Sequence, residues 1–277
     1  MPRKLFCEYG PLAYKIAAQK ECIRRTLRDF ARHEAFARQK NTEPLPTLLY
    51  SHKSLIRRKL GDVDMRLQEN KAHNLALAAP KVNGILLRPG ETFSFWTLIG
   101  RCTPRKGYRE GLTIARGETR AGVGGGMCQF TNLLHWLVLH SPLEITEHHH
   151  HDGYDLFPDF GRQVPFGCGT SIFYKHMDYR VKNTTAHTFQ ILVWTDENYL
   201  CGELRAENDL GIRYHIKETQ SRFVRLPDAI YRENTVERRT VDIVTGNETA
   251  RQILRRSHAK TMYDESYIDP ALIVTPE

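Results

Sequence analysis

The run Gly124-Gly125-Gly126-Met127-Cys128-Gln129 places one of the chain's six cysteines directly after a triple glycine. A glycine-rich turn leading into a helical pattern predicts that Cys128 lies at or near a helix N-terminus. Unpaired backbone N–H groups and the helix dipole favour the thiolate there. The same N–H groups could stabilise the oxyanion formed when a thiolate attacks a carbonyl. The glycines would let a substrate backbone approach, so the run predicts a cysteine nucleophile beside a substrate site.

Two other interpretations of the glycine run stay open. A phosphate-binding loop would need Gly-Lys-Ser/Thr, but Gly126 is followed by Met127 and Cys128. The dinucleotide pattern also fails, because Gly122 and Gly124 are followed at the third place by Met127. A buried structural cysteine at a tight helix start remains the stronger alternative, since a free cysteine is often a small core residue.

A cysteine nucleophile needs a base and usually a third group that orients this base. The run His148–His151 follows a strand predicted over residues 143–147. Alternate residues of an extended segment share a face, so His148 and His150 would point together. We expect one of these two to be the base, with Asp152, Asp155 or Asp178 as the orienting acid. Papain-like and transglutaminase-like enzymes have this chain order, which is an analogy at the level of the fold.

The histidine run also admits two plainer interpretations. Cys128 with His148 and His150 would suit zinc, but no second ligand pair with zinc-like spacing occurs in the chain. The histidines could equally be surface residues without a role. We therefore expect no metal and no other cofactor. Cys102, Cys168 and Cys201 carry no supporting pattern, and we interpret them as structural.

The elements around these residues predict an α+β fold. Phe130, Leu133, Leu134, Leu137 and Val138 form a core-facing stripe on a helix over residues 128–140. A second helix is predicted over 63–79, a turn at Pro89-Gly90, and strands over 170–174, 179–181, 189–194, 199–206, 212–217 and 236–244. We expect a single domain in which a Gly-rich loop leads into a central helix packed on a mainly antiparallel sheet.

The net charge of +8 is concentrated at one end of the chain. Residues 1–60 hold fourteen Lys/Arg against five Asp/Glu, a balance of +9, and the remaining residues balance at −1. A basic helix is predicted over residues 12–39, with an apolar stripe that docks on the core or lies on an anionic membrane. No basic–aromatic pattern supports nucleic acid binding. Three segments result: an extension (1–45), the main domain (46–250) and a polar, loosely attached tail (251–277).

The sequence favours a protein made and kept in the cytoplasm, with peripheral contact at the inner face of the membrane as an alternative. No window approaches the ~18 consecutive apolar residues of a membrane span. The N-terminus lacks the continuous apolar core of a signal peptide. Nothing in the sequence indicates an oligomeric state.

Several ordered segments resemble the VanW family, whose members accompany vancomycin B-type resistance. They are Pro89–Trp96, Glu110–Leu112, Gly124–Gln129, Glu147-His148-x-His150 and Asp178–Thr185. The family often has an arginine between the glutamate and the first histidine, and this arginine is missing here. An acid that many members carry is also missing from Arg162–Phe166, so Asp178 would have to orient the base. The resemblance implies a role near cell-wall glycopeptide resistance.

We form two hypotheses about function. The first is a cysteine-dependent acyl transferase or amidase acting on a peptide or peptidoglycan precursor. The second is a non-catalytic protein that holds a cell-wall peptide or a protein partner in the Gly-rich cleft. The residues assigned to catalysis are Cys128, His148, His150 and Asp178, and those assigned to substrate binding are Gly124, Gly125, Gly126, Gln129 and Glu91.

Overall fold

The structure, a computed structural model, describes residues 6–57, 64–115, 118–150, 153–159, 161 and 163–276. Its α-helices are α1 (Pro11–Ala31), α2 (Met65–Val82), α3 (Phe95–Ile99) and α4 (Met127–Leu139). Short 3-10 helices occupy Phe6–Tyr9, Pro104–Lys106, Glu265–Tyr267 and Pro270–Leu272. The predicted α+β class is confirmed, and most strand pairs are antiparallel.

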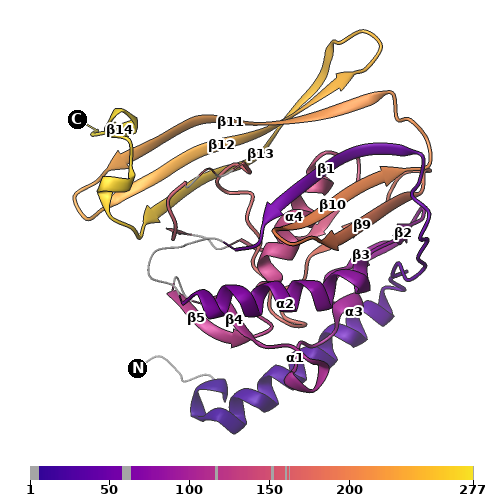
Figure 1. Cartoon of the computed structure of the whole chain (residues 1–277), viewed down its shortest axis with the longest axis horizontal. Coiled ribbons are helices and arrows are strands. Elements are labelled where there is room, and N and C mark those ends of the chain that lie inside the picture. The colour runs from indigo at the N-terminus through magenta and orange to yellow at the C-terminus, as the bar shows by residue number, and fades with distance from the viewer. Residues whose placement is uncertain are drawn as a thin grey trace.

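Within the described residues, the strands form four sheets (Figure 1). A four-stranded sheet has the order β1 (Thr47–Leu55), β10 (Tyr199–Ala206), β9 (Phe189–Thr195), β2 (Ile85–Leu87). A five-stranded sheet has the order β14 (Ile273–Val274), β11 (Ile212–Arg225), β12 (Ile230–Asp242), β13 (Glu248–Thr261), β7 (Tyr154–Asp155). The smaller sheets are β3 (Thr92–Ser94), β8 (Arg180–Lys182), β6 (Glu144–Glu147), and the pair β4 (Glu110–Ala115) and β5 (Glu118–Val123).

Helix α4 is the central helix, and its predicted stripe is buried as expected. It packs on β1 and β10, where Gly202 lets the helix approach closely. A Cβ at Gly202 would lie 2.9 Å from a methyl carbon of Leu137 and 3.0 Å from one of Leu133. Asp64 caps the N-terminus of helix α2, because its carboxylate accepts a hydrogen bond from the Arg66 N–H. The helix buries Leu75, Ala78 and Val82 in the same core. Cys128 and Gln129 thus lie at the start of a largely buried central helix.

The far half of α4 joins the two large sheets. Trp136 and Leu139 form a second apolar cluster with Cys168 and Val236, and partly buried Leu254 packs against it. Val236 belongs to β12 and Leu254 to β13, so α4 supports the long sheet from one side. The tip of the β12–β13 hairpin projects beyond the four-stranded sheet (Figure 1).

Two expectations about individual elements are wrong. The first helix ends at Ala31 instead of residue 39, and Phe36 and Lys40 instead bridge to Thr92 and Ile85. Residues 170–174 form no continuous strand; a tight turn at Lys175 (φ 57°) joins Phe173 to Met177.

The chain after residue 250 is not loosely attached, because β13 pairs with β12 over nearly its whole length. The domain boundary expected at 250 therefore falls inside a strand, while the one at 45 precedes β1. None of the described helices is both long enough and apolar enough to cross a membrane.

Candidate functional site

The glycine run makes a tight turn that is filled by the chain's own atoms. Gly124 and Gly126 have φ angles of 81° and 105°, which side-chain-bearing residues rarely adopt. A Cβ at Gly125 would lie 2.2 Å from the backbone carbon of Gly111. Cβ atoms at Gly124 and Gly126 would lie 2.5 Å from side-chain carbons of Cys102 and Lys71. The glycines therefore allow other segments of this chain, at Gly111, Cys102 and Lys71, to approach closely. We had expected a substrate at this position.

Cys128 lies where predicted, at the second residue of α4, and is partly buried. Burial raises the pKa of its thiol, while a hydrogen bond from the Ile172 backbone acts in the opposite direction. The expectation that the helix N-terminus lowers this pKa is therefore wrong for this structure. Desolvation outweighs this hydrogen bond, so the thiol is protonated at neutral pH.

The segment Gly169–Ile172 lies along α4 and contacts two candidate groups. Thr170 donates its N–H to Asn132 Oδ1 at 2.7 Å, and its hydroxyl also bonds Thr131. At one end, the backbone of Ile172 forms a hydrogen bond with Cys128. At the other end, the carbonyl oxygen of Gly169 lies 3.2 Å from His148 Nε2. The segment thus bridges the Cys128 end of α4 to its histidine end.

His148 packs against a histidine that the sequence analysis missed. The ring centroid of His148 lies 4.0 Å from that of His135 on α4 and 3.9 Å from that of His150. His135 is seven residues after Cys128, about 10 Å further along the helix axis. The structure thus brings His148 and His150 together as predicted, and places their ring contacts two turns beyond Cys128. The i, i+7 spacing of Cys128 and His135 was the signal that could have identified this third histidine.

These histidines line a cavity of about 170 Å³ between α4, β6 and the long sheet. Its lining is His135, Leu139, Ile145, His148, His150, Gly167, Cys168, Val236, Leu254 and Arg255. Burial lowers the pKa of His148 to about 3 and the pKa of His135 well below its usual value. Both imidazoles are therefore neutral at pH 7, and each can donate and accept one hydrogen bond. Within the described ranges, no three His, Cys, Asp or Glu side chains are arranged to hold a metal ion.

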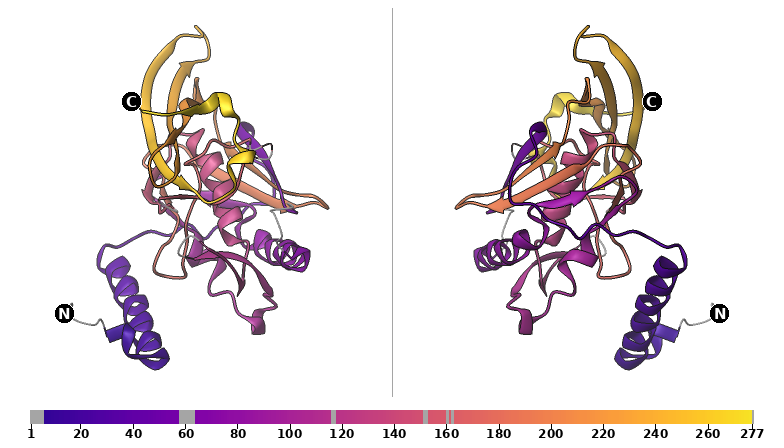
Figure 2. Two further views of the ribbon diagram at one scale, coloured as in Figure 1. Left: turned by 90° about the vertical axis from the view of Figure 1, so that its left-hand side faces the viewer. Right: turned by 90° about the vertical axis from the view of Figure 1, so that its right-hand side faces the viewer.

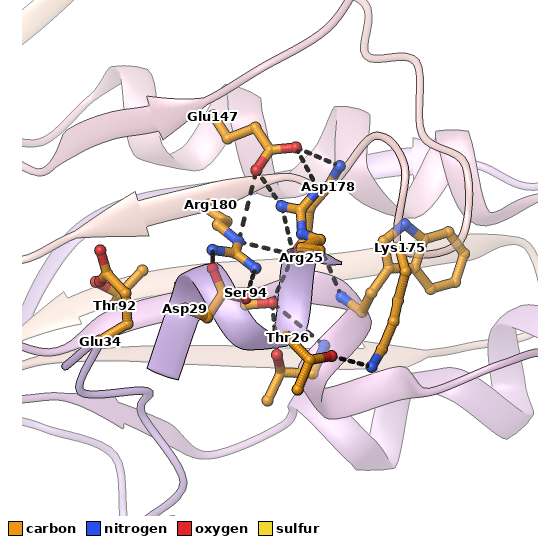
Figure 3. Close-up of polar contacts among 12 residues, drawn as sticks. Arg25, Thr26, Asp29, Glu34, Thr92, Ser94, Glu147, Lys175, Asp178 and Arg180 are labelled. Carbon is orange, nitrogen blue, oxygen red and sulfur yellow. Dashed lines mark hydrogen bonds and ion pairs between the residues drawn. The ribbon is translucent and has the colours of Figure 1, made fainter. Parts of the chain in front are cut away.

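Asp178 belongs to a different cluster, which attaches α1 to the domain (Figure 3). Its carboxylate accepts hydrogen bonds from Ser94 Oγ at 2.6 Å and from Arg180 Nε at 3.1 Å. Arg180 also forms a bidentate pair with Asp29 of α1, with both N···O distances 2.7 Å. Asp178 therefore orients an arginine and the start of α3, where we expected it to orient a histidine.

Glu147 completes this cluster and touches the histidine run. It pairs with Arg25 of α1 through both carboxylate oxygens and accepts the backbone N–H of Asp178 at 2.8 Å. His149 Nε2 lies 3.0 Å from the same carboxylate. Because alternate residues of the run point in opposite directions, His149 faces this cluster while His148 and His150 face the cavity.

The remaining predicted residues hold the framework. Gln129 Nε2 donates to Ser54 Oγ and to the Leu55 carbonyl, both at 2.9 Å, and so ties α4 to β1. Glu91 accepts the Arg88 N–H at 2.9 Å within the turn before β3. Asp155 accepts hydrogen bonds from Tyr263 and Arg232 in the long sheet. His151, Asp152 and Arg162 lie outside the described residues.

Sequence comparisons give two relatives and a family. The family described as "VanW like protein" matches residues 70–205. The vancomycin B-type resistance protein VanW of Enterococcus faecalis is 35% identical over 228 residues, covering 82% of each chain. The uncharacterised protein YoaR of Bacillus subtilis is 31% identical over 118 residues, which are 42% of this chain and 36% of YoaR. No solved structure matches the chain.

Proposed function

Because the chain belongs to the VanW family, we propose that it serves glycopeptide resistance and cell-wall metabolism by binding a cell-wall peptide or peptidoglycan precursor. The link to resistance comes from the E. faecalis relative. The ligand class follows from the role near cell-wall glycopeptide resistance that the resemblance to this family implies. The binding site we assign is the cavity lined by His135, His148 and His150. This is a non-catalytic role.

The cavity is the observation that carries this proposal. Apolar walls from Leu139, Ile145 and Val236 surround two neutral imidazoles and the Arg255 guanidinium. Such a combination of apolar surface with a few convergent polar groups is the usual form of a small-ligand site. A guanidinium recognises carboxylates well. A volume of about 170 Å³ suits one terminal residue of a peptide, with the remainder of the ligand outside.

Calorimetric titration of the full chain with a synthetic peptidoglycan stem pentapeptide tests the proposal. We expect saturable binding that His148→Ala weakens at least about tenfold, since a lost buried hydrogen bond costs ~1–3 kcal/mol. His215→Ala is the matched control, because His215 is exposed and lies on β11 outside the cavity. Absence of binding by the wild-type chain, or equal effects of the two substitutions, contradicts the proposal.

The second candidate is a cysteine-dependent acyl transferase or amidase acting on the same precursors. Cys128 would be the nucleophile, His150 or His148 the base and Asp178 the orienting acid. The observation in its favour is the Ile172 hydrogen bond at the start of α4, which adds a donor for a thiolate. Reaction would require Cys128 and a histidine to come together, because the ring contacts of His148 with His135 lie about two turns further along α4.

A thiol-reactive activity probe separates the two candidates. With the binding role, Cys128 in the folded chain is labelled no faster at pH 7 than Cys22, which is also partly exposed. With the enzymatic role, Cys128 is labelled fastest, Cys128→Ser abolishes the rapid labelling and Cys168→Ser retains it. We expect slow labelling of Cys128, because burial raises its pKa.

A further inference from the structure

The apolar side chains of α1 lie on the opposite side from its attachment to the domain. Leu12, Ile16, Ile23, Leu27 and Phe30 recur at spacings of three, four and seven, so they form one stripe along the helix. Their exposed fractions run from 51% for Ile16 to 79% for Phe30. The expectation that this stripe docks on the core is therefore not met in this structure.

Polar contacts hold α1 instead. Arg25 binds Glu147, Asp29 binds Arg180, and Thr26 accepts a hydrogen bond from Lys175 at 3.0 Å (Figure 3). In the side views, the ribbon of α1 lies to one side of the main body, and the chain after it leads to the sheets (Figure 2). A charged attachment face thus presents an apolar face outward, which is the reverse of an ordinary surface helix.

Basic residues border the exposed stripe. Lys20 and Arg24 follow one side of it and Lys15 follows the other, and all three are exposed. The side chains of Ile16, Gln19, Lys20 and Ile23 also enclose a shallow apolar hollow on this face. Exposed Phe6 and Tyr9 precede the helix, and Phe30 lies near its end. Aromatic residues at the ends and lysine and arginine at the margins are features of helices that lie in a membrane interface.

We infer that α1 docks the protein on an anionic lipid surface, with its apolar stripe at the boundary between head groups and acyl chains. The positive charge of Lys15, Lys20 and Arg24 favours a lipid bilayer over a second copy of this chain as the partner of the stripe. A second copy packed stripe to stripe would bring the two sets of basic residues together, at an electrostatic cost. An anionic bilayer neutralises the same residues and receives the apolar side chains. This inference is independent of the cavity and of the proposed ligand.

Vesicle sedimentation with the full chain tests it. Vesicles of phosphatidylcholine with phosphatidylglycerol should carry the protein down at low salt and release it at high salt, and pure phosphatidylcholine should not. Replacing Lys15, Lys20 and Arg24 by Gln should lower the partition coefficient about a hundredfold, at ~1 kcal/mol for each residue. The matched charge control replaces Arg213, Lys217 and Arg256, which are exposed on the long sheet, and should retain most of the binding.

A second pair of variants separates the apolar contribution from the charge. Leu27→Glu should reduce binding at least about tenfold, because it places a carboxylate in the apolar boundary. Val244→Glu adds the same charge at a side chain that is 90% exposed on the β12–β13 turn, and should change binding far less. Equal loss in both variants, or equal binding to charged and neutral vesicles, overturns the inference. A dimer that Leu27→Glu dissociates would assign the stripe to a second copy instead.

Discussion

At the scale of single residues, the site depends on how burial changes proton affinity. Cys128, His135 and His148 are held in their neutral forms, chiefly because burial penalises the charged form of each group. The two imidazoles line the cavity and, being neutral at pH 7, can recognise a ligand by hydrogen bonds without carrying charge. This is the residue-scale reason for placing binding before nucleophilic chemistry.

The neutral state of His148 makes stability depend on pH in a defined direction. Its pKa is about 3 in the folded chain and near its ordinary value of about 6.5 when unfolded. Between these values the unfolded chain binds a proton that the folded chain does not, so acid lowers the free energy of unfolding. The contribution is fully present above pH 6.5 and is lost as the pH falls towards 3. His140, whose folded pKa is about 4, acts in the same direction.

We expect His148→Gln to remove about 2 kcal/mol of the stability lost between pH 7 and pH 4. This figure discounts the full shift, because the ring retains some contact with solvent. Urea unfolding at several pH values measures it, and His187→Gln at a partly exposed position outside the cavity is the control. An unchanged pH slope in His148→Gln would mean that the imidazole is not buried in its neutral form.

At the scale of elements, the glycine turn before α4 determines where the candidate residues on this helix lie. The turn needs Gly125 because the backbone of Gly111 lies against it, and Asn74 donates to the Gly125 carbonyl at 2.9 Å. The three glycines thus allow tight backbone packing that determines where α4 begins. The start of α4 in turn determines the positions of Cys128 and His135 along the helix.

Gly125→Ala should unfold the chain or lower its stability by at least about 3 kcal/mol, since the added carbon meets backbone that cannot yield. Gly169→Ala is the matched control, because a Cβ there meets nothing within 4 Å. Thermal melts of the two variants should differ clearly. Similar melting temperatures would show that the turn adapts, and would restore the possibility that its glycines leave space for a ligand.

The elements also show where sequence reasoning succeeded and failed. The stripe of α4 identified a buried helix because a central helix must bury the residues at that spacing. The same reasoning failed for α1, where five residues at helical spacing are exposed, since periodicity shows which residues share a face and not what covers that face. Strand β13 was missed because most of its side chains are polar and exposed, as in an ordinary tail. The placement of His135 and Asp178 depends on contacts between distant segments, which one sequence does not display.

At the scale of the whole molecule, a few buried charges join α1 to the domain. Arg180 links Asp29 of α1 to Asp178 of the core, and both arginines of the cluster are largely buried. Such pairs are costly to break from one side, because the remaining charge stays desolvated. The attachment is therefore specific but small, and its strength should be sensitive to one carboxylate.

Asp29→Ala should release α1 without unfolding the domain. Losing a bidentate, charge-assisted pair costs roughly 2 kcal/mol, so amide exchange in α1 should accelerate about thirtyfold. Arg24→Ala is the control, because its pair with Glu21 is 3.7 Å long and exposed. Hydrogen exchange with mass spectrometry resolves the two. If α1 keeps its protection in Asp29→Ala, the helix is held by contacts other than the arginine cluster.

The position of Glu147 has a consequence for communication across the molecule. This residue binds Arg25 of α1 and is followed in the chain by His148, which lines the cavity. One peptide bond therefore separates the residue that binds α1 from a residue of the cavity wall. If binding of α1 to a lipid surface alters the affinity of the cavity for its ligand, then ligand binding must alter the affinity of α1 for that surface by the same factor, as thermodynamic linkage requires. Any such coupling would act through the adjacent residues Glu147 and His148.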